Sequence, residues 1–307
     1  MTTANQLIAV NSDVLTSDSV FDMMVSKIDA SINWVVPGQL HGYLETRYVR
    51  RSEQTVVVYL SSQTGCAQAC RMCHLTATGQ VKLENASVGD LVEQARKVLS
   101  WYDENGPNAK VVHFNFMARG EPLDNSQILS NGEELLSRLA EEARARDLFP
   151  KFQISTIIPT SFKGQALTDV FPVIHPEIYY SIYNMNPAFR RRWLPRALPA
   201  EHGLALLKDW QYLTSKIPKL HYAFIEGEND GEDVVRAICD AVNDLALRVN
   251  VNIVRYNPYS EKFGREPSYE VIVRNAEIFK EYLPHARVQI KPRLGFDVNA
   301  SCGMFVE

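Results

Sequence analysis

The sequence lacks long hydrophobic runs: no stretch approaches the roughly 18 consecutive apolar residues that indicate a transmembrane helix. Its first residues, MTTANQLIAVNSDV, lack the basic start and apolar centre of a secretory signal. Low-complexity segments, internal repeats and obvious domain linkers are also missing. We therefore expect a cytoplasmic protein that does not associate with membranes.

The chain also lacks a basic excess. Its 307 residues carry a formal net charge of −4, and 46% of them are hydrophobic, which is typical of a globular protein. Nucleic-acid-binding proteins are often basic overall, because phosphate contacts dominate their affinity. Arginines do cluster locally, and each cluster is either a solvated face or a contact site: Arg47, Arg50 and Arg51, then Arg190, Arg191, Arg192 and Arg196.

Cysteine is scarce, and its number is odd. Five cysteines in a reducing compartment argue against a disulfide framework. Three of them, Cys66, Cys70 and Cys73, lie within eight positions in the segment GCAQACRMCH. This clustering indicates metal or cluster chemistry.

Strands and helices alternate along most of the sequence. Near-continuous apolar strands separated by amphipathic helices predict an α/β fold with a parallel sheet, open or closed. Ser87 is placed to cap one helix. We expect strands at 54–60, 110–117, 151–158, 177–184, 219–227, 248–257 and 286–292, and helices at 18–33, 87–104, 131–146, 200–214, 231–247 and 268–283.

Several polar residues fall at the carboxyl ends of these strands, where such folds place their chemistry. Cys66 follows the first strand and Glu121 the second, Ser155 lies inside the third, and Asn257 ends the sixth. We expect these side chains to gather at one end of the sheet.

The cysteine spacing Cys66-x3-Cys70-x2-Cys73 fits a [4Fe–4S] cluster. Three thiolates bind three irons, and the fourth iron stays open for a substrate ligand. A zinc site completed by His74 would crowd four ligands into nine residues. Cys70 to His74 also matches the C-x-x-C-H haem signature, but haem attachment leaves Cys66 without a role.

Seven segments in order resemble the RlmN/Cfr family of radical S-adenosylmethionine (SAM) RNA methylases, from about residue 40 to the C-terminus. They are SSQTGCAQACRMC, MARGEPLDN, ISTIIP, SIYNMNPAFR, FIEGEND, VRYNPYS and RLGFDVNASCG. The resemblance implies a partial (β/α)6 barrel in residues 45–307 with a C-terminal catalytic loop. Residues 1–44 would form a short N-terminal extension with a helix.

The resemblance also implies roles for single residues. Glu121, beside Gly120 in the GEP segment, would receive the SAM ammonium group; otherwise it is a helix-start carboxylate. Ser155, Ser181 and Asn257 match SAM-contacting positions, and each would otherwise be a capping or internally satisfied polar residue. Glu45 matches a glutamate that helps proton handling at the substrate, against the alternative of a solvated strand-edge charge.

Cys302 matches the family cysteine that is methylated by a first SAM. A radical made from a second SAM takes hydrogen from this methyl group, and the carbon then adds to C2 or C8 of an adenine in RNA. The alternative is a buried, inert thiol. The resemblance implies a [4Fe–4S] cluster and SAM as cofactors, with rRNA or tRNA as substrate and an electron donor such as flavodoxin. We expect a monomer.

The sequence departs from the family at several positions. Tyr59 replaces the second catalytic cysteine, which resolves the covalent adduct, and Cys239 is a poor substitute because it sits in a helix at apolar spacing. Met72 and Tyr183 replace a family aromatic residue and a histidine. About 45 residues precede the matching region, in place of a separate helical domain. Radical chemistry on a peptide or small molecule, and a non-catalytic cysteine-ligated binding protein, remain alternatives.

Overall fold

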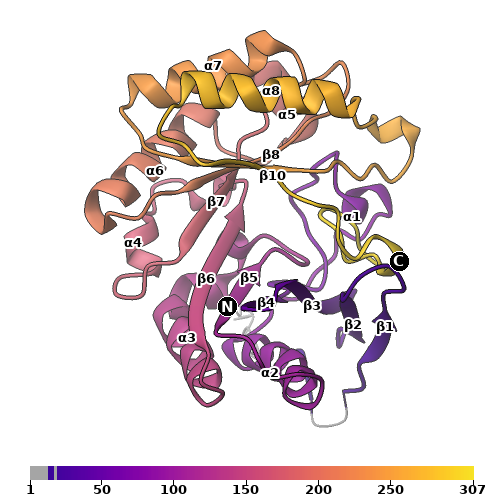
Figure 1. The fold of residues 1–307 in the computed structure, drawn as a ribbon. Helices are drawn as coiled ribbons and strands as arrows, with labels where there is room; N and C mark the ends of the chain where they lie inside the picture. Colours follow the sequence, from indigo (N-terminus) through magenta and orange to yellow (C-terminus); the bar gives the residue numbers. More distant parts are fainter. Residues whose placement is uncertain (1–12, 17–18) are drawn as a thin grey trace, which may run out of the picture.

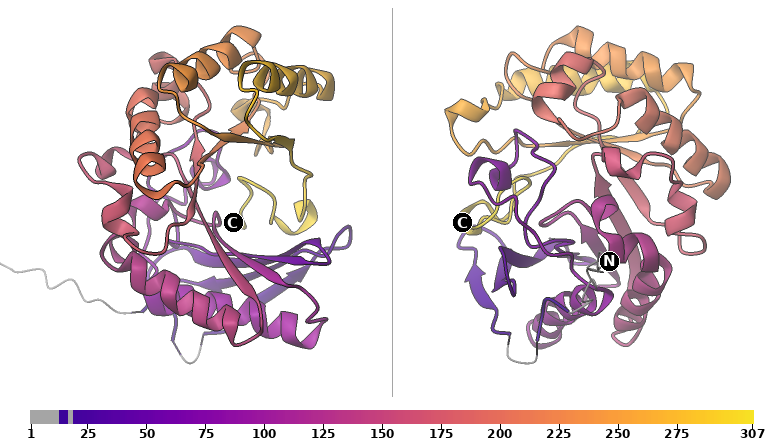
Figure 2. Two further views of the ribbon diagram at one scale, coloured as in Figure 1. Left: turned by 60° about the vertical axis from the view of Figure 1, so that its left-hand side comes forward. Right: turned by 180° about the vertical axis from the view of Figure 1, so that it is seen from behind.

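The computed structural model describes residues 13–16 and 19–307. Its centre is one sheet of ten strands that lie in chain order from β1 to β10 (Figure 1). The first strands pair antiparallel, and from β4 onward every pairing is parallel. The sheet curls, and helices cover its outer side (Figure 2). The partial barrel expected from the sequence is therefore confirmed.

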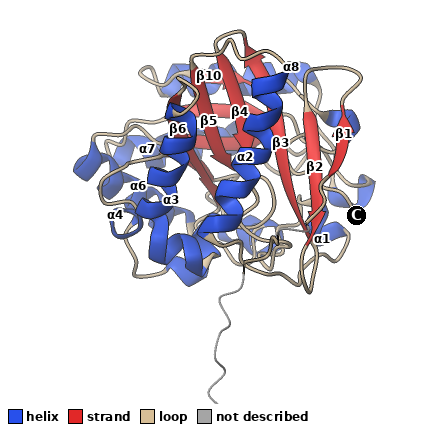
Figure 3. Ribbon diagram, turned by 90° about the horizontal axis from the view of Figure 1, so that it is seen from below, coloured by secondary structure: helices blue, strands red, loops and turns tan. Residues whose placement is uncertain are grey.

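The antiparallel part consists of four strands that follow one another towards one edge of the sheet (Figure 3). They are β1 (Asp22–Val25), β2 (Ile32–Pro37), β3 (Tyr43–Ser52) and β4 (Thr55–Tyr59). The expected boundary between residues 44 and 45 falls inside β3, so the N-terminal extension belongs to the same sheet.

The helix expected over 18–33 is wrong in its described part, which forms β1, a turn and the start of β2. Side-chain oxygens hold the turn: Ser26 Oγ accepts from Ile28 N at 3.2 Å, and Asp29 Oδ1 accepts from Ser31 N at 2.8 Å. Such local hydrogen bonds compete with helix formation. Met23 and Ile28 have the spacing of one helix face, yet both side chains are exposed.

The parallel part is a series of strand–helix units. Its strands after β4 are β5 (Val111–Phe116), β6 (Phe149–Thr156), β7 (Glu177–Ser181), β8 (Lys219–Ala223), β9 (Asn250–Val254) and β10 (Val288–Ile290). With β4, seven described strands run parallel, which matches the seven strand segments expected from the sequence. The resemblance implied a barrel of six units, and the seventh strand is the three-residue β10.

Helices connect these strands. They are α1 (His74–Ala77), α2 (Val88–Glu104), α3 (Ser126–Arg144), α4 (Leu167–Val170), α5 (Pro187–Trp193), α6 (Ala200–Thr214), α7 (Glu232–Asp244) and α8 (Tyr269–Tyr282). The cap expected at Ser87 is confirmed, because its Oγ accepts from Asp90 N at 3.0 Å. Asp90 returns a bond to Ser87 N at 2.7 Å, which completes a capping box.

Helix α3 begins at Ser126, five residues before the expected start at 131, because Asn125 caps it. The Asn125 side chain accepts from Gln127 N at 2.7 Å. Its amide donates to Ser62 O at 2.6 Å and to Ala86 O at 2.9 Å, and so ties the helix start to the loop after β4. The cap therefore helps to position the cysteine-bearing loop.

Candidate active site

The loop after β4 carries three cysteines and is fixed by backbone contacts. Gly65 packs against the chain so closely that a Cβ there would lie 2.2 Å from Lys82 O. Cys66 N donates to Gln80 O at 3.1 Å, and Cys73 N donates to Cys70 O at 3.0 Å. A side chain at position 65 would displace this loop.

Cys66, Cys70 and Cys73 line one cavity of about 140 Å³ at the carboxyl ends of the parallel strands. Gly120, Glu121, Ser155 and Ser181 line the same cavity. The structure thus brings together seven of the ten residues singled out from the sequence. Burial raises the pKa of all three thiols, and their mutual repulsion raises the pKa of Cys66 and Cys70 further.

The cysteines suit separate metal atoms of a cluster better than one ion. Among the described residues, no three Cys, His, Asp or Glu side chains converge on a single ion position. His74, the fourth ligand of the zinc alternative, directs Nε2 to Asn257 O at 3.1 Å. A cubane cluster needs no such convergence, because each thiolate binds its own iron.

Glu121 begins a short 3-10 helix and faces the cysteine cavity. One carboxylate oxygen accepts from Leu123 N at 3.1 Å, and the other accepts from Ile157 N at 3.1 Å. Burial raises the pKa of Glu121 to about 7. Glu121 is therefore both a helix-start carboxylate and a cavity residue, so the two interpretations are compatible. Beside it, Gly120 has φ of 92°, and a Cβ there would meet Ser62 Oγ at 2.5 Å.

Asn257 lies three residues beyond the end of β9, rather than at the strand end. It does not line the cysteine cavity. Its Nδ2 donates to Cys302 O at 2.9 Å and to Ser301 Oγ at 3.2 Å, while Oδ1 is buried without a partner. Asn257 therefore holds the C-terminal segment and leaves one acceptor free.

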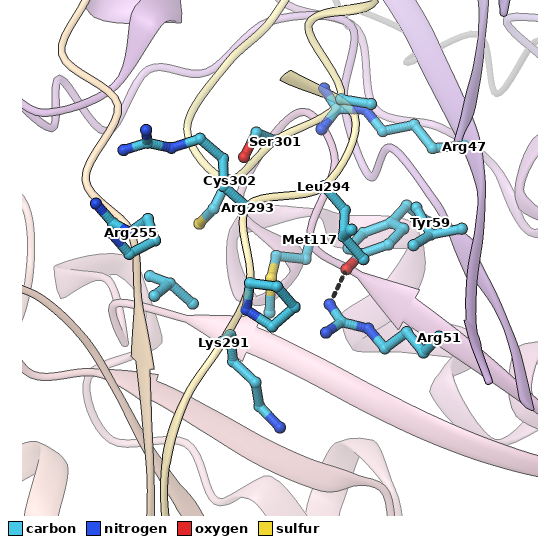
Figure 4. Close-up of a pocket in the computed structure, with 14 residues that line it drawn as sticks. Arg47, Arg51, Tyr59, Met117, Arg255, Lys291, Arg293, Leu294, Ser301 and Cys302 are labelled. Atoms are coloured by element: carbon cyan, nitrogen blue, oxygen red, sulfur yellow. Dashed lines mark hydrogen bonds between the residues drawn. The ribbon is translucent and has the colours of Figure 1, made fainter. Parts of the chain in front are cut away.

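Cys302 lines a second cavity of about 50 Å³ together with Tyr59 and Arg51 (Figure 4). Met117 lines both cavities, and Gly303, the next residue after Cys302, lines the cysteine cavity. The two sites are therefore adjacent. Burial raises the pKa of Cys302 to about 11, so its thiol is protonated near neutral pH.

Tyr59 faces Cys302 across this second cavity, where the resemblance places a resolving cysteine. Its hydroxyl accepts from Arg51 at 2.9 Å. Cys239 lies in the main core on α7 and lines neither cavity. The described structure therefore offers no second thiol beside Cys302 apart from the three clustered cysteines.

Glu45 is fully buried, so the interpretation as a solvated strand-edge charge is wrong. Its Oε1 accepts from Arg119 Nε at 2.7 Å and from Val306 N at 3.0 Å. Its Oε2 accepts from Arg47 at 2.8 Å and from Asn33 at 3.0 Å. Burial alone would raise the pKa of Glu45, but the two guanidiniums and these hydrogen bonds lower it overall.

Arg47 and Arg119 also hold the C-terminal segment, a role that the sequence analysis missed. Arg47 donates to Met304 O at 2.7 Å, and Arg119 donates to Val306 O at 2.6 Å. The ring of Phe305 lies against both guanidiniums. The available signal was their position inside motifs, two residues after Glu45 and within MARGEP.

The second arginine cluster is divided by burial. Arg190 is buried and donates to Ile182 O at 2.7 Å and to Leu198 O at 2.6 Å, so it is structural. Arg191, Arg192 and Arg196 are exposed, as expected for a solvated face. Among the described residues, no helix is both long and apolar enough to span a bilayer.

Comparisons with known proteins agree with this geometry, although no family model matches the chain. The probable dual-specificity RNA methyltransferase RlmN of Desulforudis audaxviator is 26% identical over 292 residues, covering 92% of this chain and 84% of the relative. The RlmN of Campylobacter jejuni is 26% identical over 271 residues, covering 86% and 71%.

Solved structures share the fold. A radical SAM methyltransferase from Sphaerobacter thermophilus has a TM-score of 0.75 at 21% identity, covering 92% of this chain and 80% of its own. The hydrogenase maturase HydG has a TM-score of 0.57 at 11% identity, covering 77% and 52%.

The fold, the three-cysteine cavity and the likeness to the RlmN methyltransferases together indicate a radical SAM enzyme, with a [4Fe–4S] cluster and SAM as its cofactors. Within that class the chain is a divergent relative of the RlmN/Cfr-like methyltransferases.

Proposed function

We propose that the chain methylates a carbon of adenine in RNA, with Cys302 as the methyl carrier. One observation carries this proposal: Cys302 lies beside the three-cysteine cavity, with Met117 lining both cavities. The relatives named RlmN are RNA methyltransferases, which supports RNA as the substrate. Aromatic C2 and C8 of adenine are poor nucleophiles, so ordinary methyl transfer from SAM would not modify them.

Seven residues would hold the cofactors. When bound, the cluster and SAM supply the 5′-deoxyadenosyl radical that removes hydrogen from the methyl group. The cysteine thiolates would bind three irons, as Cys66, Cys70 and Cys73 line one cavity. Glu121, Gly120, Ser155 and Ser181 line the remaining wall, where they would orient SAM.

Asn257 lines neither cavity, and it would act by holding the segment that carries Cys302. Its Nδ2 is used on the segment that carries Cys302, and its buried Oδ1 has no partner in the described structure. A buried acceptor without a donor costs about 1–3 kcal/mol, so a donor from SAM at this position would be favourable. Glu45 would act as a positioning residue, because its carboxylate accepts four hydrogen bonds and all four come from within the protein.

Before any methylation, the Cys302 thiol must lose its proton, because the thiolate is the nucleophile. Arg47 and Arg51 lower the pKa of Cys302, although burial outweighs them. These two guanidiniums would stabilise the thiolate at the moment of attack.

The reaction would also need a reductant, and we propose an electron donor such as flavodoxin. We further propose that the protein is a cytoplasmic monomer. Cluster reduction by flavodoxin and sedimentation of the anaerobic protein test these two points. An RNA-free reaction with flavodoxin should already release 5′-deoxyadenosine if Cys302 carries a methyl group.

The decisive experiment is mass spectrometry of nucleosides from RNA incubated with anaerobic protein, SAM and reductant. Methyladenosine, with one methyl group found on Cys302 by peptide mapping, supports the proposal. An unmodified Cys302 thiol with methylation intact refutes the carrier role.

Tyr59 favours a second candidate, in which the chemistry diverges from that of the relatives. A carbon bonded to Cys302 is normally freed by attack of a neighbouring thiolate on its sulfur. A phenol forms no equivalent bond, and Tyr59 is already engaged with Arg51. Stable protein–RNA crosslinks that an added small thiol resolves would show that only resolution has been lost. Modification of a peptide or small molecule, with RNA unmodified, would favour the second candidate.

A further inference from the structure

The cavity beside Cys302 is strongly basic. Five cationic side chains line it, and its described lining contains no carboxylate (Figure 4). The five are Arg47, Arg51, Arg255, Lys291 and Arg293. Such a concentration of one charge around a small space is costly unless counter-charges lie nearby.

Three of the five cations have their counter-charge just outside the cavity. Arg47 pairs with Glu45 at 2.8 Å. Arg255 and Arg293 share Glu266, at 2.7 Å from Arg255 Nε and 3.1 Å from Arg293. Each of these three cations therefore has an ion-pair partner within the fold, and each carboxylate is shared by two guanidiniums.

The other two cations have only neutral partners. Arg51 donates to the Tyr59 hydroxyl at 2.9 Å, and Lys291 donates to Gln289 Oε1 at 2.6 Å. In the described part of the chain, neither has a carboxylate within ion-pair distance. Arg51 is exposed to solvent and Lys291 partly so, which leaves both accessible to a ligand.

The charge on Lys291 is unfavourable in the free protein. Burial, followed by repulsion from Arg51 and Lys219, lowers the pKa of Lys291 to about 8. A bound anion would offset this repulsion. The guanidinium of Arg51, held by Tyr59, also offers donors in the planar arrangement that suits phosphate oxygens.

We propose that Arg51 and Lys291 form an anion subsite, which binds a phosphate group of the substrate that reaches Cys302. The inference deepens the proposed function and rests on it for the placement of the substrate. The cavity of about 50 Å³ has room for a group of phosphate size but not for a whole nucleotide. The phosphate belongs either to a free nucleotide or to RNA, and in both cases Tyr59 acts by orienting Arg51.

The test compares adenosine 5′-monophosphate with adenosine by calorimetry, on the full chain loaded with cluster and SAM. The monophosphate should bind about tenfold more tightly or better, and Arg51→Gln and Lys291→Gln should each remove most of that preference. Arg287→Gln is the matched control, because Arg287 is an exposed cation just before β10 and outside the cavity lining. Equal binding of both probes, or an equal loss in the control, overturns the subsite.

A short adenosine-containing RNA distinguishes the two sources of phosphate. If both variants also weaken RNA binding, the phosphate is that of RNA; if only the monophosphate is affected, the substrate is a free nucleotide. Iron content is measured on every variant and should not change, because neither Arg51 nor Lys291 lines the three-cysteine cavity. Phosphate-dependent binding without methylation of Cys302 would reject the proposed function alone, and methylation without phosphate preference would reject the subsite alone.

Discussion

Replacing Glu45 by Gln should destabilise the protein strongly and loosen the segment that carries Cys302. The substitution keeps the shape of the side chain but removes the only carboxylate bonded to Arg47 and Arg119 in the described structure. Both guanidiniums are buried, so two charges would remain without a counterion. Breaking a buried ion pair from one side costs about 3–5 kcal/mol.

This loss is a large part of the roughly 5–15 kcal/mol that stabilises a typical folded protein. We expect the midpoint of thermal unfolding to fall by about 10 °C. The carboxylate contribution is present above the unfolded pKa, near 4.5, and is lost as pH falls through the lowered folded pKa. The difference between variant and parent should therefore stay constant from pH 6 to 8.

Two further variants separate charge from shape. Glu134→Gln removes an exposed carboxylate that pairs with Arg138 at 3.5 Å, and it should cost less than about 0.5 kcal/mol. Adding Arg47→Met to Glu45→Gln should recover part of the loss, because one unpaired cation is removed.

The assay is chemical denaturation together with hydrogen exchange of residues 298–306. Glutamine keeps only one acceptor oxygen, so an amide donor must face either Arg119 and Val306 N or the opposite pair of donors. Exchange in this segment should therefore accelerate more than in the core. Stability within 1 kcal/mol of the parent, or unchanged protection of this segment, would refute the positioning role of Glu45.

Three other predictions concern the thiols and Glu121. Alanine at any one of Cys66, Cys70 and Cys73 should abolish cluster assembly and SAM cleavage. The control Cys239→Ala should retain full iron content, because that thiol lies in the core. Iron analysis and deoxyadenosine release check this, and full iron in all three alanine variants would contradict it. In cofactor-free protein, alkylation of Cys302 by iodoacetamide should be slow at pH 8 and rise about tenfold per pH unit towards its pKa of about 11; a fast reaction at pH 7 would contradict this. Because the folded pKa of Glu121 is raised to about 7, the unfolded chain ionises first, and the stability of cofactor-free protein should fall between pH 4.5 and 7 and then level off. Glu121→Gln should remove that slope in denaturation curves, and a persisting slope would assign it to another group.

The sequence predicted the parallel part of the fold well, for a local reason. Near-continuous apolar strands and helices of 3.6-residue periodicity can be recognised within short stretches of sequence. The capping box of Ser87 likewise involves a residue only three positions away. The helix prediction for residues 18–33 was wrong, because Val20, Met23 and Ile28 have helical spacing yet are exposed. There the hydrogen bonds of Ser26 and Asp29 determine the conformation instead.

The candidate site also has a part that could be predicted from the sequence and a part that could not. The residues predicted for the cysteine cavity could be found because they lie near the carboxyl ends of parallel strands, and these ends meet in space. The ion pairs of Glu45 were not, because Arg119 is 74 positions away in the sequence and Val306 is 261 positions away. In the sequence, Glu45 and Arg47 could be read as surface charges, whereas in the structure both are buried and form an ion pair.

These buried charges are better explained by positioning than by stability. A buried carboxylate between two guanidiniums contributes little net free energy compared with an apolar replacement of the same volume. It does, however, determine one geometry for the segment that ends with Val306.

That geometry matters because three successive residues serve two cavities. Ser301 and Cys302 line the basic cavity, while Gly303 lines the cysteine cavity. Gly303 has φ of 78°, where a side chain would be strained, and its carbonyl accepts from His74 N at 3.1 Å. A shift of the segment by one residue would remove the Cys302 sulfur from the boundary between the cavities. Asn257, His74 and Glu45 each form a hydrogen bond with this C-terminal segment, at Cys302, Gly303 and Val306. We infer that the buried charges serve to place the Cys302 sulfur rather than to stabilise the fold.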